Sequence, residues 1–67
     1  MKDLKESGGE VVIQFSSDEL LIINNSLNEV CNGLDVQEFH SRMGVDRSAV
    51  EILLRSVGTV VDRVWNK

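Results

Sequence analysis

The chain has 67 residues, one cysteine, one histidine and a formal net charge of −4. This length supports a single small domain, and such a chain buries only about 60% of the surface that its unfolded form exposes. One cysteine excludes an internal disulfide, and one Cys with one His cannot supply a four-ligand zinc site. Extra stability is therefore expected from oligomerisation or from good helix packing.

The sequence shows neither a framework of cysteines nor an apolar leader, which predicts a protein of the reducing cytoplasm. Its apolar run at 20–23 is cut off by Asn24 and Asn25, far short of the ~20 residues that span a bilayer. We therefore expect no membrane function.

The first predicted element is a short strand at about 10–16. Residues 1–9 are polar and end in Gly8 and Gly9, which predicts a flexible N-terminal segment before a single domain at 10–67. Residues 10–16 are rich in β-branched and aromatic types, with Val11, Ile13 and Phe15 on one side.

A first helix is predicted at about 17–32. Ser16 and Glu19 stand at the spacing of a capping box, and Gly33 is expected to stop the helix in a left-handed conformation. At ~100° per residue one apolar face emerges, which we expect to be core. It consists of Leu20, Ile23, Leu27, Val30 and Cys31.

Two further helices follow, at about 36–43 and 46–65. We expect Asp35 and Asp46 to cap them and Gly44 to end the first of the two. The long helix carries a continuous apolar stripe and, outside it, Glu51 at i,i+4 spacing from two arginines. The stripe consists of Val50, Leu53, Leu54, Val57, Val60, Val61, Val64 and Trp65.

The predicted fold is therefore mainly α, a three-helix domain with a short N-terminal strand. In the alternative, Gly58 and Thr59 end the long helix, and 60–65 forms a C-terminal strand that pairs with 11–15 in an α+β domain. We prefer the helix because the stripe keeps its phase across Gly58. The strand 10–16 then lacks a mate within the chain, and its copy in a second subunit is the simplest mate, which predicts a homodimer.

The residues that carry chemistry are few. Cys31 falls on the apolar face of the first helix and is read as a small hydrophobe, and His40 is read as a partly exposed polar residue. Asp18 and Glu19 suit a helix start without any catalytic role. We expect no catalytic, cofactor-binding or metal-binding residues, and no small-molecule substrate.

The first helix offers a candidate contact surface. Four asparagines gather beside the core face around a leucine, which supplies amide donors and acceptors to another protein chain. Alternatively, the asparagines secure neighbouring loops. The predicted partner-binding residues are Leu21, Asn24, Asn25, Asn28 and Asn32. The leading hypothesis is a non-enzymatic protein-interaction module, homodimeric, acting as an adaptor or as an inhibitor, immunity or antitoxin-like protein.

Residues 36–57 resemble a helix-turn-helix unit, with Gly44 in the turn, Val45 after it, and Val50 and Leu53 facing inward. His40 stands where that family usually has a small residue. The resemblance implies an alternative function in DNA binding. Its candidate contacts are Arg42 and Arg47 on phosphates, and Ser48 and Arg55, with Glu51, at the groove. The pI of about 4.7 makes this the weaker hypothesis.

Overall fold

The computed structural model describes residues 1–33 and 35–65, so the predicted domain end at residue 67 lies outside the described residues. The chain forms a β-hairpin followed by helices, as the mainly helical prediction requires. The elements are β1 (Lys2–Ser7), β2 (Glu10–Gln14), α1 (Ser17–Asn28), the π-helical turn η1 (Glu29–Gly33), α2 (Phe39–Met43) and α3 (Arg47–Trp65).

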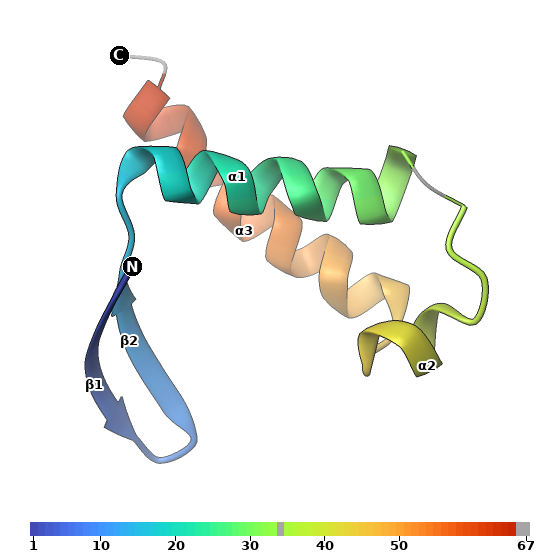
Figure 1. The fold of residues 1–67 in the computed structure, drawn as a ribbon, viewed down its shortest axis with the longest axis horizontal. Coiled ribbons are helices and arrows are strands. Elements are labelled where there is room, and N and C mark those ends of the chain that lie inside the picture. Colours follow the sequence, from blue (N-terminus) through green and yellow to red (C-terminus); the bar gives the residue numbers. More distant parts are fainter. Residues whose placement is uncertain (34, 66–67) are drawn as a thin grey trace.

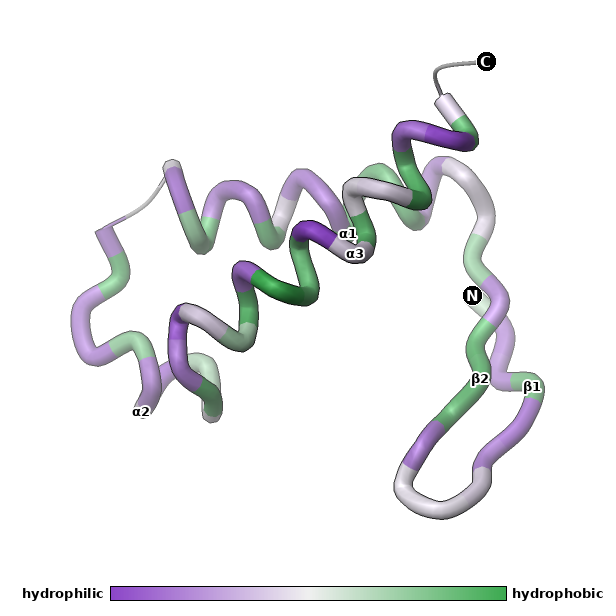
Figure 2. Tube along the Cα trace, turned by 180° about the vertical axis from the view of Figure 1, so that it is seen from behind, coloured by the Kyte–Doolittle hydropathy of each residue, from purple (hydrophilic) through white to green (hydrophobic). Residues whose placement is uncertain are grey.

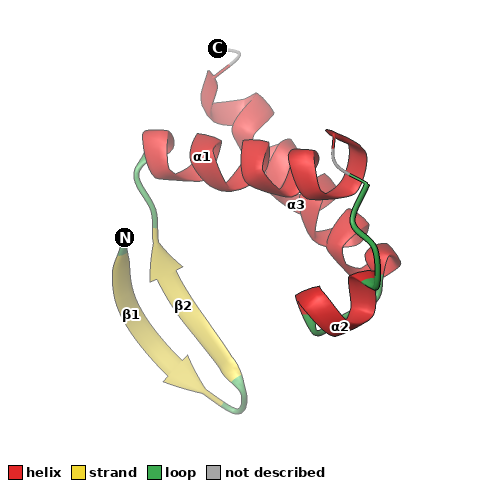
Figure 3. Ribbon diagram, turned by 45° about the vertical axis from the view of Figure 1, so that its right-hand side comes forward, coloured by secondary structure: helices red, strands yellow, loops and turns green. Residues whose placement is uncertain are grey.

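Two helices, α1 and α3, pack across each other and form the body of the molecule (Figure 1). The hairpin leaves the first end of α1, and α2 lies beyond the opposite end (Figures 1 and 3). The hairpin thus projects from the helix pair, and it does not lie between the two helices.

The two strands form an antiparallel hairpin in which Ser7 pairs with Glu10 and Lys2 with Gln14. Gly8 and Gly9 connect them with φ angles of 58° and 83°, and positive φ at both positions is what a two-residue turn of type I′ requires. The expectation that the strand lacks a mate within the chain is wrong. Its mate is β1, in the segment 1–9 that the sequence analysis treats as flexible.

The start of α1 confirms the predicted capping box, but its end differs from the prediction. The Glu19 N–H donates to Ser16 Oγ at 3.1 Å, and the Ser16 N–H donates to Glu19 Oε1 at 2.9 Å. The α-helical hydrogen bonding ends at Asn28, and the chain continues as η1. Gly33 is not left-handed; a Cβ there would lie 1.8 Å from Glu29 Oε2, so the glycine accommodates the Glu29 side chain.

The second helix is shorter than predicted. It begins at Phe39, and its N-cap is Glu38, a left-handed residue with φ 52° and no side-chain cap, so the prediction that Asp35 caps it is wrong. The predicted end is confirmed: Gly44 has φ 79° and its N–H donates to the His40 carbonyl at 2.8 Å.

The long helix α3 runs unbroken from Arg47 to Trp65, so the stretch 60–65 is helical here. The Asp46 carbonyl accepts from the N–H groups of Ala49 and Val50 at 3.0 and 3.4 Å. Gly58 lies inside the helix, and a Cβ built on it would lie 3.6 Å from Asn24 Oδ1 of α1. The α3 backbone therefore passes close beside the Asn24 side chain.

The core between α1 and α3 is thin. Among the described residues the buried apolar side chains are Cys31, Val50 and Val61, and none of them is fully enclosed. Three residues of the expected inward stripe, Leu53, Val64 and Trp65, are 52%, 41% and 45% exposed. Figure 2 shows apolar segments along α3 and β2. The helix pair thus shelters only part of its apolar stripe.

The chain is flat and open for its size. Its accessible surface is 5343 Å², whereas a compact monomer of 7.5 kDa is expected to expose about 4,200 Å². Its radius of gyration is 13.3 Å, against about 11 Å for a compact domain of this length. The extents of 33 × 33 × 16 Å describe a layer about one helix pair thick.

Candidate protein-binding surface

One side of the helix pair is closed by three contacts between α3 and the α1–η1 segment. Asn24 lies against Gly58, the Trp65 indole Nε1–H donates to the Ser17 carbonyl at 3.3 Å, and Arg47 Nη1 donates to the Cys31 carbonyl at 2.8 Å. These contacts hold the two helices together at the middle and at both ends.

The predicted asparagine patch lies beside this closed side and is only partly available. Leu21 and Asn24 are half-buried, whereas Asn25, Asn28 and Asn32 are exposed. Asn32 Nδ2 donates to Asn28 Oδ1 at 3.0 Å, and Asn24 Nδ2 approaches Asn25 Oδ1 at 3.5 Å. The structure therefore brings the four amides into two neighbouring pairs, and Asn24 belongs to the helix contact.

The most exposed aliphatic side chain of α1 is Ile22, which the sequence analysis missed. Ile22 is 64% exposed and lies one helical turn from Asn25 and Ser26 on the outer side. Helical periodicity could have indicated its exposure, because at ~100° per residue Ile22 lies ~140° from the centre of the predicted core face. Its counterpart on α3 is Ile52, which is 63% exposed.

The other side of the helix pair is open and apolar. Since Asn24 and Gly58 mark the closed side, helical spacing places Ile23 of α1 and Leu53 and Val64 of α3 toward the opposite side. Ile23 is half-buried, and the two α3 residues are exposed. An apolar strip of the core is thus uncovered.

The hairpin adds further apolar surface, because every residue of both strands is exposed. Val11, Val12 and Ile13 are 49%, 52% and 38% exposed, and Phe15 at the link to α1 is 37% exposed. The pairing puts Val11 and Ile13 on one face with Glu6 and Asp3, and Val12 on the other. A two-stranded sheet with both faces in solvent is marginally stable by itself.

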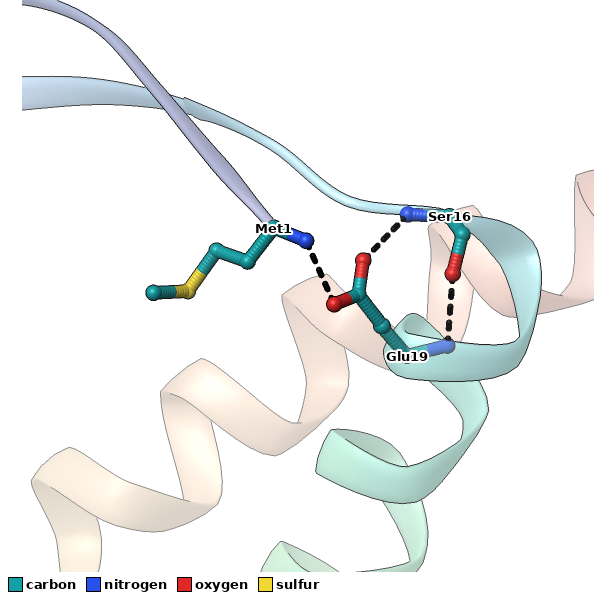
Figure 4. Close-up of polar contacts among 3 residues, drawn as sticks. All are labelled: Met1, Ser16 and Glu19. Carbon is teal, nitrogen blue, oxygen red and sulfur yellow. Dashed lines mark hydrogen bonds and ion pairs between the residues drawn. The ribbon is translucent and has the colours of Figure 1, made fainter.

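Glu19 joins the hairpin to the helix pair (Figure 4). Its carboxylate accepts from the Met1 ammonium at 2.5 Å and from the Ser16 N–H at 2.9 Å. The hydrogen bond from the ammonium and then the Ser16 backbone bond lower the pKa of Glu19 from 4.5 to about 2. This carboxylate is the electrostatic link between β1 and the start of α1.

The residues of the helix-turn-helix alternative divide into two groups. Arg47 is half-buried, and its guanidinium lies 4.6 Å from the centre of the Phe39 ring while it donates to the Cys31 carbonyl. Arg42, Ser48 and Arg55 are exposed. Arg47 thus ties η1, α2 and α3 together, an internal role that the sequence analysis missed.

The two residues with the most reactive side chains lie in different settings. Cys31 is buried in the helix contact, and His40 is exposed on α2. Among residues 1–33 and 35–65 there is no group of three or more His, Cys, Asp or Glu side chains that could hold a metal ion. Within the same residues, no helix combines the length and the apolar character that a bilayer crossing demands.

The comparisons with known proteins give no relative: no family model, no curated protein and no solved structure matches this chain. Its function is therefore argued from its surfaces alone.

Proposed function

We propose that this chain is a small, non-enzymatic protein-interaction module. The observation that carries the proposal is the surplus of about 1,100 Å² of accessible surface over a compact monomer of the same mass. The uncovered surface includes apolar side chains such as Leu53 and Val12, each 52% exposed. A chain that leaves this much apolar surface in water gains stability when another protein covers it.

The outer side of α1 is the surface that we assign to a foreign partner. It combines one exposed aliphatic side chain, Ile22, with the exposed amides of Asn25 and Asn28, and Asn32 of η1 continues it. An apolar anchor beside groups that both donate and accept hydrogen bonds is typical of protein interfaces. Leu21 and Asn24 support this surface from the half-buried edge. An adaptor, or an inhibitor, immunity or antitoxin-like protein, would use it in the same way.

The open apolar side of the helix pair and the hairpin suit a second copy of the chain. Leu53, Val64 and the hairpin valines would remain in solvent in a monomer. Contact with a second copy would remove them from water without any other partner, so we propose a homodimer as the form that presents the outer side of α1.

The test compares two isoleucines of equal exposure on different helices. Ile22→Arg places a charge in the proposed surface, and Ile52→Arg places the same charge on α3, since the two residues are 64% and 63% exposed. Proteins captured by the wild type should be lost with Ile22→Arg and retained with Ile52→Arg, and the loss should recur with purified components. Equal capture by both variants would contradict the assignment of α1.

The alternative function in DNA binding has weaker support. Arg47 is engaged with the Cys31 carbonyl and with Phe39, and Glu51 lies on the same helix between Arg47 and Arg55. Fewer free cations mean weaker attraction to phosphates. We expect no binding to duplex DNA at low salt; binding that weakens in Arg55→Ala would favour the alternative.

A further inference from the structure

The two edges of the hairpin differ in how they are protected. β1 carries Lys2, Asp3, Lys5 and Glu6, and its register with β2 shifts between Asp3 and Lys5, which leaves Leu4 as an extra residue. Charges and bulges are the devices by which proteins prevent an edge strand from pairing with another chain. The edge of β1 is therefore blocked.

The edge of β2 is less protected, because it has no bulge and its one charged residue, Glu10, lies at the turn. Val11, Val12 and Ile13 form an uncharged run of β-branched residues, and the register shift adds no residue to β2. All three are exposed. Such an edge is a template for another strand.

The backbone groups at this edge belong to two residues. Ser7 and Glu10 close the two-residue turn, so Glu10 bonds toward β1, and hydrogen-bonded pairs then alternate along the ladder. Val12 likewise bonds toward β1, whereas Val11 and Ile13 direct their N–H and C=O groups to the free edge. Backbone N–H and C=O groups form strong hydrogen bonds, so these groups can pair with the backbone of another strand.

A second β2 strand matches this edge in the antiparallel direction. With Val12 on a two-fold axis, Val11 lies opposite Ile13 of the copy. The N–H and C=O groups that point to the free edge in one chain then face those of the other chain. Glu10 then faces Gln14 of the copy without like charges in contact, and the two Val12 side chains meet across the axis. The β2 edge is therefore complementary to itself.

We propose that two copies of this chain join β2 to β2 into a four-stranded antiparallel sheet, with Val12 at the two-fold axis. The proposal rests on the protein-interaction function above and names a second copy as the partner. The surplus surface of about 1,100 Å² belongs to the chain as a whole, and the β2 contact would cover the part of it that lies on the hairpin.

The experiment uses opposite charges at the axis. In Val12→Lys and in Val12→Glu the two copies place like charges directly across from each other, so each variant alone should sediment as a monomer where the wild type is a dimer. An equimolar mixture pairs lysine with glutamate and should restore the dimer. Circular dichroism confirms the helix content of each variant.

Leu4→Glu is the matched control, because Leu4 and Val12 are both 52% exposed and lie on opposite strands. It should remain dimeric. Val12→Glu is the safer of the two test variants, since its neighbour across the hairpin is Lys5. If Val12→Lys fails to fold, the oligomeric state of Val12→Glu alone still tests the proposal. A Val12→Glu variant that dimerises as strongly as the wild type overturns it.

The failure of this proposal is separable from the failure of the proposed function. A dimer that survives Val12→Glu but dissociates in Leu53→Glu would place the contact on the open side of the helix pair and overturn only the strand pairing. A wild type that is monomeric from micromolar to millimolar concentration also overturns it, while the comparison of Ile22→Arg with Ile52→Arg tests the function independently.

Discussion

The helix pair and the hairpin are stabilised in different ways, although they belong to one chain. The helix pair has its own buried side chains, Cys31, Val50 and Val61, and side-chain hydrogen bonds between segments far apart in sequence. The hairpin has no buried side chain, because every residue of its strands is exposed, and the Met1 ammonium joins it to the helices through Glu19. Local turn geometry can therefore form a hairpin that is not stabilised by packing against the rest of the chain.

The largest effect is expected in the core of the helix pair. Val50 is 4% exposed, and Val50→Ala should lower the free energy of unfolding by about 2 kcal/mol through lost burial and a residual cavity. Thermal unfolding of a chain this size should then shift down by roughly 8–16 °C. Val12→Ala is the control in the hairpin and should change the melting temperature of the helices little. Equal shifts of the melting temperature in the two variants would contradict the claim that packing stabilises the helix pair and not the hairpin.

The next effect concerns the contact that joins η1, α2 and α3. Arg47→Ala removes the hydrogen bond to the Cys31 carbonyl and the stacking on Phe39, and should cost about 1–2 kcal/mol in chemical denaturation. Arg55→Ala removes an exposed arginine of the same helix and should cost less than about 0.5 kcal/mol. If Arg47→Ala were as stable as Arg55→Ala, the internal role of Arg47 would be wrong.

A smaller effect of opposite sign is expected at Gly58. Alanine is favoured over glycine inside a helix by up to about 1 kcal/mol, and the nearest atom to the new Cβ, Asn24 Oδ1 at 3.6 Å, is at an ordinary contact distance. Gly58→Ala should therefore raise the melting temperature. Gly44→Ala, at φ 79°, should lower it by a similar amount. A loss of stability in Gly58→Ala would mean that Asn24 needs the space.

The smallest effect is a pH dependence at the junction between the regions. Because folding lowers the pKa of Glu19 from 4.5 to about 2, its contribution to stability is complete above about pH 4.5 and is lost as the pH falls toward 2. The difference in stability between the wild type and Glu19→Gln should shrink over this interval. A difference that stays constant with pH would show that the carboxylate charge does not hold the hairpin.

Local signals in the sequence predicted the elements that depend on local chemistry. The capping box of Ser16 and Glu19, the stop at Gly44 and the helix through Gly58 were all readable from the residues. The hairpin was missed because β1 is charged and lacks alternation, although Gly8 and Gly9 between two short runs are a hairpin signal.

Tertiary contacts explain what the sequence could not predict. Nothing local indicates that Glu38 adopts a left-handed conformation, or that Arg47 bonds back to a carbonyl sixteen positions earlier. The periodicity of α3 placed Leu53 and Val64 inward, but both are exposed. Helical periodicity identifies the apolar side of a helix and does not identify which part of that side another element covers. Which part of the stripe is uncovered depends on how α1 and α3 pack on each other.

Hydrogen exchange at the free edge of β2 tests most directly whether a second chain completes this fold. At high protein concentration the amides of Val11 and Ile13 should be protected, and on dilution they should exchange like an unpaired edge, while the buried α3 residue Val61 stays protected. Fast exchange at Val11 and Ile13 at every concentration would contradict the account.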